Sequence, residues 1–293
     1  MKVRFGVGIG AETAPDELAG IVDDLESSGV DSLWFSELVY TPAVDPFVGM
    51  AYALARTDRL KVGTSVAILP GRHPVLVAKQ LASLAALAPK RVLPVFGLHS
   101  ALPAERDIFV VPDGRRAAVF DESLDLLRSA LRGGDVSFDG DYFTVRSAHV
   151  QPLPATPIDI WLGGSAPAAL NRIGKFGDGW LGSFLTPDEA GAARRRIEAA
   201  AVAAGRTIEP DHYGISLAVG DGALPADVLA AVRRRRPDVD PGQLVAADWP
   251  ALHRQLDGYL AAGLTKFVIR AAGPTDRSAF LERFTTELLP RQS

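Results

Sequence analysis

Short apolar runs alternate along the chain with longer segments in which apolar residues recur every three or four positions. The short runs are typical of buried strands, and the longer segments are typical of helices that pack one face on a sheet. The pattern predicts eight strands, at residues 3–8, 32–35, 61–69, 91–96 and 158–162, from 177 onward, and at 213–219 and 266–270. Helices are predicted at about 15–28, 45–57, 115–131, 187–204 and 252–262, with others that start at 74, after 165 and near 280.

Neighbouring parallel strands need a crossover connection, and a helix between each pair of strands supplies it, so we expect an α/β fold. Eight strands favour a closed (β/α)8 barrel, a TIM barrel, over an open doubly wound sheet. We expect one barrel domain over residues 1–293. Its insertions are expected where the periods are lost, at about 97–112, 133–156 and 221–250. The second insertion carries a predicted hairpin at 136–145, whose Asp139-Gly140 pair favours a type I′ turn.

Composition removes several classes of function. Apolar residues make up 47% of the 293 residues, and 31 basic residues nearly balance 35 acidic ones. Without a basic surplus, we expect neither nucleic acid nor an anionic membrane as a partner. The absence of cysteine excludes disulfides, thiolate metal sites and cysteine nucleophiles. No apolar run approaches the roughly 20 residues of a membrane helix, and the start of the chain is typical of a strand rather than a signal peptide, so we expect a soluble cytoplasmic protein.

The stretch from Ile158 to Trp180 has the clearest local signal for a binding site. Its apolar strand ends at Gly163-Gly164, Ser165 stands at an N-cap position, and Pro167 lies in the first turn of the predicted helix. Free N–H groups at such a helix N-terminus can hold a phosphate. Most glycine pairs of this kind only connect two elements, which is the alternative. Asp178 is expected to fix the turn into the sixth strand.

The working face of a TIM barrel is formed by the C-terminal ends of its strands. The residues that the predicted strand ends bring to this face are Glu37, Ser65, Leu98, His99, Gly163, Gly164, Ser165, Ser183 and Arg270. We therefore expect the functional site among these residues.

Several segments, in their order and spacing, resemble the bacterial luciferase-like superfamily, whose members use flavin or the deazaflavin F420. The resemblance covers nearly the whole chain. It rests on Asp31–Glu37 (DSLWFSE), Asp45-Pro46-Phe47, Lys61–Val66 (KVGTSV), Arg72-His73-Pro74 with Ala78-Lys79-Gln80, and Gly163–Trp180. Thr64-Ser65-Val66 and the form of the glycine loop are similar to the F420-dependent oxidoreductases of this superfamily, and the chain resembles an uncharacterised subgroup of that branch.

The resemblance implies a cofactor, F420 or alternatively FMN, that lies across the strand ends. In the F420 branch it also implies a non-proline cis peptide bond, which falls here at Ser65-Val66 and would press the backbone against the deazaflavin ring. Glu37 would contact the ring system. Gly163, Gly164 and Ser165 would bind the cofactor phosphate, and Ser183 would border the pocket. Homodimers are common in the superfamily, so we expect a homodimer.

The substrate end of the expected site departs from the familiar members. Members that oxidise sugar phosphates and alcohols have a histidine directly after the acidic residue of strand two, and here that position is Leu38. The sugar-phosphate members also have a lysine near the position of Thr186, which cannot neutralise a phosphate. The segment after strand four, usually glycine-rich with a carboxylate, is residues 94–99 here, and the next carboxylate is Glu105. The resemblance therefore leaves the small organic substrate unidentified.

Each candidate side chain also has a structural interpretation. Glu37 could be a cofactor contact or a general base, or it could pair with another residue in the barrel mouth. His99 could face the deazaflavin, or it could cap or pack a loop. Arg270 could bind a substrate acid or the acidic tail of the cofactor, or pair with a carboxylate, and Arg277 is a further candidate of this kind. The run from Arg233 to Arg236 is interpreted as a solvated helix end that could also attract the cofactor tail.

The leading hypothesis is an F420-dependent oxidoreductase that transfers hydride between C5 of the deazaflavin and a small organic substrate, with Glu37 and His99 as catalytic candidates. One alternative is a reduced-FMN-dependent monooxygenase of the same fold. Another is a barrel that binds the cofactor without turnover, which Leu38 and the altered strand-four loop favour. A metal-dependent hydrolase is disfavoured, because five scattered histidines and no cysteine form no ligand cluster, so we expect no metal.

Overall fold

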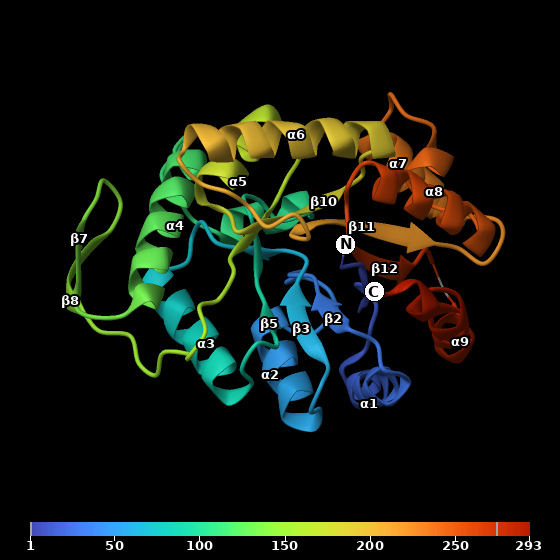
Figure 1. Ribbon diagram of the computed structural model, residues 1–293, viewed down its shortest axis with the longest axis horizontal. Coiled ribbons are helices and arrows are strands. Elements are labelled where there is room, and N and C mark those ends of the chain that lie inside the picture. The colour runs from blue at the N-terminus through green and yellow to red at the C-terminus, as the bar shows by residue number, and fades with distance from the viewer. Residues whose placement is uncertain (1, 274) are drawn as a thin grey trace.

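The computed structural model describes residues 2–273 and 275–293, and its helices surround a parallel sheet (Figure 1). The strands of this sheet are β1 (Arg4–Gly8), β2 (Ser32–Phe35), β3 (Lys61–Thr64), β4 (Ala67–Ile68), β5 (Val92–Leu93), β6 (Val95–Gly97), β9 (Trp161–Gly163), β10 (Gly179–Ser183), β11 (Tyr213–Val219) and β12 (Lys266–Ala271). The α-helices are α1 (Leu18–Ser28), α2 (Pro46–Arg56), α3 (Pro74–Leu87), α4 (Arg116–Arg132), α5 (Pro167–Phe176), α6 (Pro187–Ala203), α7 (Ala226–Arg235), α8 (Trp249–Ala261) and α9 (Arg277–Glu287).

The sheet closes into a barrel because two of its strands are interrupted. The strand order is β4-β6-β9-β10-β11-β12-β1-β2-β3-β5. β3 and β4 are successive parts of the third strand, and β5 and β6 are successive parts of the fourth, on either side of Pro94. β3 pairs with β5 and β4 pairs with β6, so the two ends of the order meet. The ten segments therefore occupy eight strand positions, and the predicted α/β TIM-barrel fold is confirmed.

The interruption at Pro94 follows from the chemistry of proline. Proline has no backbone N–H to donate to a neighbouring strand. The carbonyl of Pro94 still accepts a hydrogen bond from the Trp161 N–H at 3.0 Å, which holds the fourth strand against β9. The predicted strand at 91–96 is therefore two short pieces rather than one.

Two tryptophans fill the inside of the barrel. The side chains that pack together there are Trp34, Val95, Trp161, Leu181 and Val268. Glycines on neighbouring strands leave room for the indoles. A Cβ on Gly63 would lie 2.6 Å from the Trp34 ring, and a Cβ on Gly179 would lie 2.3 Å from the Trp161 ring. The larger core lies outside the barrel, between the sheet and the helices.

The third insertion predicted from the sequence, residues 221–250, is partly helical. It contains α7 and a short 3-10 helix, η3 (Pro241–Gln243). Val232 is the buried residue of α7, and the last turn consists of arginines. The helix has only ten residues, three of them arginines at its end, so its few apolar positions do not stand out from the polar segment around them.

The hairpin formed by β7 (Val136–Asp139) and β8 (Thr144–Ala148) stands outside the barrel beside α4 (Figure 1). The predicted type I′ turn at Asp139-Gly140 is wrong, because Gly140 does not adopt the positive φ that this turn requires. Residues 140–143 instead form a longer loop around Glu122 of α4. The Glu122 carboxylate accepts from the N–H groups of Asp141, Tyr142 and Phe143 at 2.9, 2.8 and 2.7 Å, so a tertiary anchor overrides the local turn preference.

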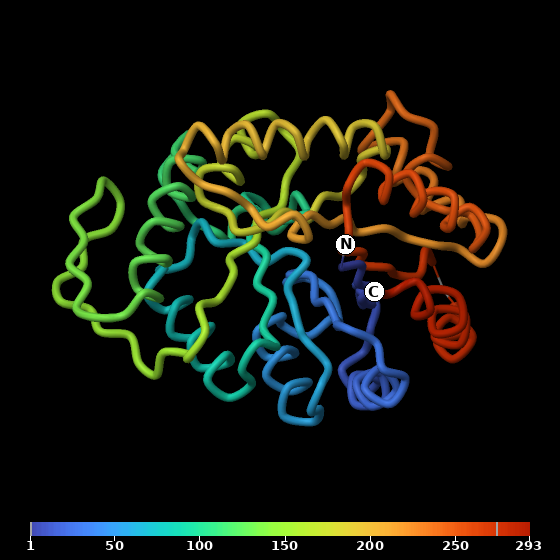
Figure 2. Tube along the Cα trace, in the orientation of Figure 1, coloured from blue at the N-terminus to red at the C-terminus, as the bar shows by residue number. Residues whose placement is uncertain are grey.

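The two ends of the described chain lie side by side (Figure 2). The N–H of Val3 donates to the Ser293 hydroxyl at 3.2 Å, and the N–H of Phe5 donates to the Gln292 side chain at 3.1 Å. The C-terminal residues therefore cover the free edge of the β1 backbone where the chain enters the barrel. In the described part of the chain, none of the helices combines the length and the apolar character needed to cross a membrane.

Candidate functional site

The C-terminal ends of the strands carry mostly small side chains. Strand register places Ser183 of β10 beside Ser216 of β11, and places Arg270 of β12 beside Ala218. Ser36, directly after β2, has its hydroxyl 3.4 Å from the Ser65 hydroxyl. Apart from Arg270, none of these neighbours is larger than serine. Predicted site residues from the second, third, sixth and eighth strands therefore share this end of the barrel.

Val66 stands between two glycines at the same end. The Ser65-Val66 peptide bond is cis, at the position that the resemblance implies. A Cβ on Gly97 would lie 2.6 Å from Val66 Cγ2, and a Cβ on Gly163 would lie 2.9 Å from Val66 Cγ1. Both positions must be glycine for Val66 to stand where it does. Gly97 is a site residue that the sequence analysis missed, because a single glycine at a strand end is a common feature.

Glu37 is buried and fully engaged by the protein. One carboxylate oxygen accepts from the Ile68 N–H at 2.6 Å, and the other pairs with the guanidinium of Arg72. Burial raises the pKa of Glu37, and the charge of Arg72 opposes this rise without cancelling it. In the structure, the Glu37 side chain connects the end of β2 to β4 and to the loop that follows β4. Its contact with a cofactor remains a prediction.

Arg72 is the partner that sequence reasoning did not assign to Glu37. Its Nε donates to the Ile68 carbonyl at 3.0 Å. Its guanidinium lies over the rings of Phe47 and Phe109, 5.6 Å from each centroid. Arg72 therefore links the loop after β4 to α2 and to the insertion before α4. The motif Arg72-His73-Pro74 was visible in the sequence, but nothing in it indicates these partners.

Glu105 anchors the insertion after β6. The side chain lies in the 3-10 helix η2 (Pro103–Ile108) and is fully buried. Its carboxylate accepts from the Tyr40 N–H at 2.8 Å and from the Ser100 hydroxyl at 2.6 Å. This carboxylate joins the loop after β2 to the loop after β6, so the two segments that border the expected substrate end are fixed to each other.

His99 and Leu98 follow β6 and take different directions. Leu98 packs against the main core. His99 is exposed, and its ring forms no hydrogen bond within the described residues. Burial of part of the ring lowers the pKa of His99, and the charges of Arg116 and Arg106 lower it further. The imidazole is therefore neutral near neutral pH and free to accept a proton.

The glycine turn after β9 combines a special backbone with an open helix end. Gly164 has a φ of +118°, and its carbonyl accepts from the Trp180 indole N–H at 2.8 Å. The predicted N-cap at Ser165 is wrong. Pro167 is the first residue of α5, and the residue before a proline is driven into an extended conformation, which makes Ala166 the N-cap. Ala166 offers no side-chain cap, so the first-turn N–H groups of α5 remain available to a ligand.

Asp178 fixes the turn into β10, as predicted. Its carboxylate binds Arg128 through two hydrogen bonds of 2.7 and 2.8 Å, and it accepts from Arg206 at 2.9 Å. It also accepts from the Ile160 N–H at 2.9 Å, just before β9. These bonds connect α4, the loop after α6 and two neighbouring strands at the end of the barrel opposite the glycine turn.

Arg270 forms no ion pair or hydrogen bond within the described residues. Burial lowers the pKa of its guanidinium, and the charge of Arg235 at the end of α7 lowers it further. Arg235 lies over the Phe184 ring, 4.3 Å from the centroid, directly after Ser183. Arg235 and Arg270, neither of which pairs with a carboxylate among the described residues, therefore stand beside the ends of β10 and β12. Arg235 belongs to the run that the sequence analysis interpreted as a helix end, but nothing in the sequence indicated that it approaches Arg270.

Arg277 and Arg236 are paired with carboxylates. Arg277 pairs with Asp24 of α1 at 3.4 Å, so it lies against the outer layer of helices. Arg236 pairs with Glu189 of α6 at 2.6 Å and with Asp238 at 2.9 Å. Both arginines are therefore already engaged, in contrast to Arg270. Over residues 2–273 and 275–293, no group of three or more histidine and acidic side chains could hold a metal ion.

The barrel, the strand-end residues and the glycine turn define a protein of the luciferase-like class, and the chain belongs to the family of luciferase-like monooxygenases, which matches residues 1–261. The F420-dependent glucose-6-phosphate dehydrogenase of Beutenbergia cavernae is 29% identical to it over 329 aligned positions, covering 99% of this chain and 97% of the relative.

Two solved structures share the fold at low sequence identity. An F420-dependent secondary alcohol dehydrogenase in complex with an F420-acetone adduct superposes with a TM-score of 0.83 at 19% identity, over 99% of both chains. The oxygenating constituent of 3,6-diketocamphane monooxygenase from Pseudomonas putida, in complex with FMN, gives a TM-score of 0.75 at 17% identity, over 100% of this chain and 99% of that one. At identities below 20%, these similarities support a shared fold and do not assign an activity.

Proposed function

We propose that the protein is an F420-dependent oxidoreductase that transfers hydride between C5 of the deazaflavin and a small organic substrate. The observation that carries this proposal is the placement of Val66 between Gly97 and Gly163, at the barrel end where the family resemblance puts the cofactor ring. The full-length similarity to an F420-dependent glucose-6-phosphate dehydrogenase favours F420 over other cofactors. FMN is the alternative, since one protein of the same fold is known with FMN.

The residues at the barrel mouth fit such a cofactor in two places. Gly97 and Gly163 make room for the Val66 side chain, and the small side chains of the neighbouring strand ends are proposed to leave space for a planar ring system above it. The glycine turn and the uncapped N-terminus of α5 suit a phosphate, because first-turn N–H groups and the helix dipole attract an anion. Gly163, Gly164 and Ser165 are the residues proposed to hold the phosphate, and Ser65 and Ser183 are proposed to border the ring.

His99 is the proposed proton acceptor or donor. Its ring is exposed and has no hydrogen-bond partner in the described chain, so it can reach a substrate hydroxyl or carbonyl. The lowered pKa of His99 favours the neutral imidazole, which accepts a proton when a substrate is oxidised. Glu37 is less suited to this task, because both of its carboxylate oxygens already have partners. We propose that Glu37 positions the backbone next to Val66, whose carbonyl accepts from the Glu37 N–H at 3.2 Å.

Arg270 and Arg235 are the proposed contacts for an acidic group of the substrate or of the cofactor tail. Both arginines lack a carboxylate partner in the described residues, and an anion between them would relieve their mutual repulsion. Thr186 has a different task, because its hydroxyl caps α6 by accepting from the Glu189 N–H at 3.3 Å.

Titration with oxidised F420 and with FMN tests the proposal. We expect saturable F420 binding with a dissociation constant on the order of micromolar, followed by the fluorescence of the cofactor. Binding of FMN in this range without binding of F420 would overturn the proposal. The protein reduced with F420H2 is then offered a panel of enones, imines and nitro compounds. Complete absence of turnover with intact F420 binding would favour a barrel that holds the cofactor without catalysis.

A homodimer is also part of the proposal. Val39 and Tyr40, after β2, and Val48 and Tyr52, on α2, are exposed by 50%, 64%, 64% and 39%. Large apolar side chains gathered on one segment are typical of an interface. Light scattering on a size-exclusion column should give twice the chain mass of 31.1 kDa. A mass of one chain at micromolar concentration would contradict this expectation.

A further inference from the structure

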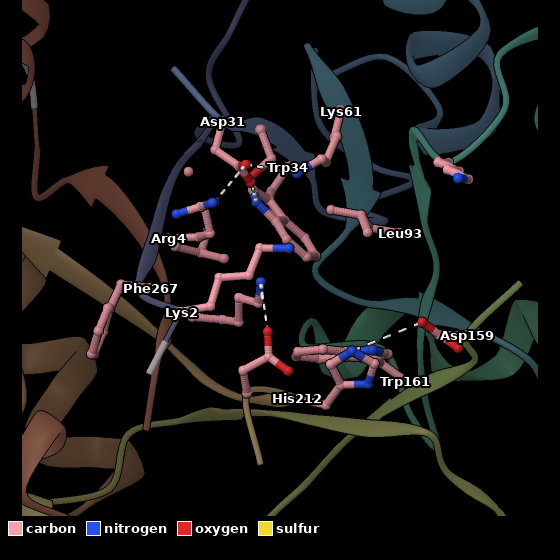
Figure 3. A pocket seen from close by; sticks show the side chains of 16 residues that line it. Lys2, Arg4, Asp31, Trp34, Lys61, Leu93, Asp159, Trp161, His212 and Phe267 are labelled. Carbon is pink, nitrogen blue, oxygen red and sulfur yellow. Dashed lines mark hydrogen bonds and ion pairs between the residues drawn. The ribbon is translucent and has the colours of Figure 1, made fainter. Parts of the chain in front are cut away.

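A cavity of about 160 Å³ opens at the N-terminal end of the barrel, opposite the proposed cofactor site (Figure 3). It is lined by the residues with which the strands begin, among them Arg4 of β1, Lys61 of β3 and Lys266 of β12. Nothing in the proposed function uses this cavity. We call it the basal cavity.

The floor of the basal cavity is aromatic and apolar. It is lined by the indoles of Trp34 and Trp161, together with Leu93 and Val268. The Trp34 indole N–H donates to the Ser32 hydroxyl at 2.9 Å, and the Trp161 ring lies 5.3 Å from the His212 ring. Both indoles are thereby held in place. Because Trp34, Trp161 and Val268 also belong to the cluster inside the barrel, the floor closes the cavity toward the opposite mouth.

The rim of the basal cavity is cationic. Five basic side chains line it, Lys2, Arg4, Lys61, Lys90 and Lys266, against the three carboxylates of Asp31, Asp159 and Asp211, which leaves an excess of two positive charges. Figure 3 shows Arg4, Lys61 and Asp31 on one side, and His212 and Asp159 on the other. Arg4 and Lys61 share Asp31, at 3.5 and 2.7 Å. Lys2 and Lys90 form no ion pair within the described residues.

Lys266 is the least exposed of the five cations on the rim. Its ammonium lies 4.0 Å from the Asp211 carboxylate, at the limit of an ion pair. Burial lowers the pKa of Lys266, and the nearby charges of Lys2 and Lys61 lower it further, although Asp31 and Asp211 oppose the shift. An anion in the basal cavity would stabilise the charged form of Lys266.

We propose that the basal cavity binds a small aromatic carboxylate, with its ring against Trp34 and Trp161 and its carboxylate toward Lys266. The size of the cavity supports one ring, since a cavity of about 150 Å³ in a protein core accommodates a single benzene molecule. The indoles favour a planar ring by stacking, and the cationic rim selects a negative charge. This inference is independent of the proposed function, because the two sites lie at opposite ends of a filled barrel.

The competing interpretation is a layer of charges that only closes the bottom of the barrel. Such a layer would pair each cation with its own carboxylate, whereas Arg4 and Lys61 share the single carboxylate of Asp31. It would not require the excess of positive charge, nor an open volume above two indoles. The two interpretations differ in whether a ligand binds, and this can be measured directly.

Benzoate is the probe, titrated into the full chain while tryptophan fluorescence and the heat of binding are recorded. We expect saturable binding that quenches the fluorescence, with no comparable effect from benzyl alcohol, which lacks the charge.

Lys266→Met should weaken benzoate binding at least tenfold. The matched control is Lys175→Met, at an exposed position of α5, and it should leave benzoate binding unchanged. Trp161→Phe should reduce the quenching while calorimetry still detects binding. Lys61→Gln is the second variant should Lys266→Met fail to fold, and it should weaken binding at least threefold.

Three outcomes would overturn the inference. The first is the absence of saturable benzoate binding. The second is binding that Lys266→Met and Lys61→Gln, both shown to be folded by circular dichroism, leave unchanged. The third is competition between benzoate and F420, which would place the carboxylate at the opposite mouth. Benzoate binding of equal strength in the absence and presence of saturating F420 supports the basal cavity. If F420 does not bind at all, the proposed function fails while this test remains intact.

Discussion

The guanidinium of Arg72 pairs with the carboxylate of Glu37, and both side chains also bind the backbone of Ile68, Arg72 at the carbonyl and Glu37 at the N–H. The two residues therefore clamp one turn of the chain directly after the Ser65-Val66 peptide. Glu37 is almost completely buried, whereas Arg72 keeps 25% of its side-chain surface exposed. Replacing Arg72 should therefore affect stability differently from replacing Glu37.

Arg72→Met should destabilise the protein by about 2–4 kcal/mol, because it leaves the buried Glu37 carboxylate without its cation. Methionine retains apolar packing against Phe47 and Phe109. Arg56→Met is the matched control. Like Arg72, Arg56 lies over an aromatic ring, that of Tyr52, and pairs with a carboxylate, that of Asp23, but this pair lies on the surface. Its cost should be below about 1 kcal/mol. Urea unfolding measures both values, and equal costs for the two variants would refute the clamp.

The contribution of Glu37 to stability should fall as pH rises. Burial raises the pKa of Glu37, so the folded state holds this proton more tightly than the unfolded state does. Stability from this group is then fully present below the ordinary glutamate pKa and is lost as pH rises through the raised value. The difference in unfolding free energy between the unmodified protein and Glu37→Gln should shrink along this window. A difference that grows with pH would show that Arg72 outweighs burial.

Gly164→Ala should lower F420 affinity at least tenfold. A side chain at the φ of +118° is strained, and its Cβ would meet the Ala169 Cβ at 3.0 Å, which displaces the turn that precedes α5. Gly134→Ala serves as the control. Gly134 also has a positive φ, +83°, but nothing lies within 4 Å of its Cβ position. Both variants should lose about 1–3 kcal/mol of stability. Only Gly164→Ala should weaken F420 binding, as measured by cofactor fluorescence.

Tyr213→Phe should leave stability unchanged or raise it by up to about 1 kcal/mol. The Tyr213 hydroxyl is buried without a hydrogen-bond partner in the described chain, and burial raises the pKa of Tyr213 to about 12. Tyr259→Phe is the contrast, because the Tyr259 hydroxyl donates to the Leu185 carbonyl at 2.5 Å. That variant should lose about 1–2 kcal/mol. Thermal unfolding distinguishes the two, and a loss in Tyr213→Phe as large as in Tyr259→Phe would contradict the assignment.

Much of the barrel could be predicted because strands buried on both faces appear in the sequence as continuous apolar runs. The bounds of β2 and β11 agree with the prediction residue for residue. The weakest predictions were those that depend on distant partners. Glu122 reshapes the hairpin loop from another helix, and α7 has little apolar surface to signal its period.

The candidate site was predictable to the extent that it follows from strand ends. Ser65, Gly163, Ser183 and Arg270 lie there because a parallel barrel brings all its strand ends together. The partners of these residues were not predictable. Arg72 reaches Glu37 from 35 positions away, and Arg235, at the helix end that the sequence did indicate, approaches Arg270 from a different element. Such contacts depend on loop conformation, which local residue patterns do not determine.

Strand β12 carries Lys266 at one mouth of the barrel and Arg270 at the other, with Val268 between them in the packed interior. A molecule that enters one mouth therefore has no passage to the other. The two ends can diverge separately during evolution, because a substitution that changes ligand preference at one end leaves the chemistry of the other untouched. Homologues that keep Trp34 and Trp161 inside the barrel could thus retain one cofactor at the C-terminal mouth while the ligand of the basal cavity changes.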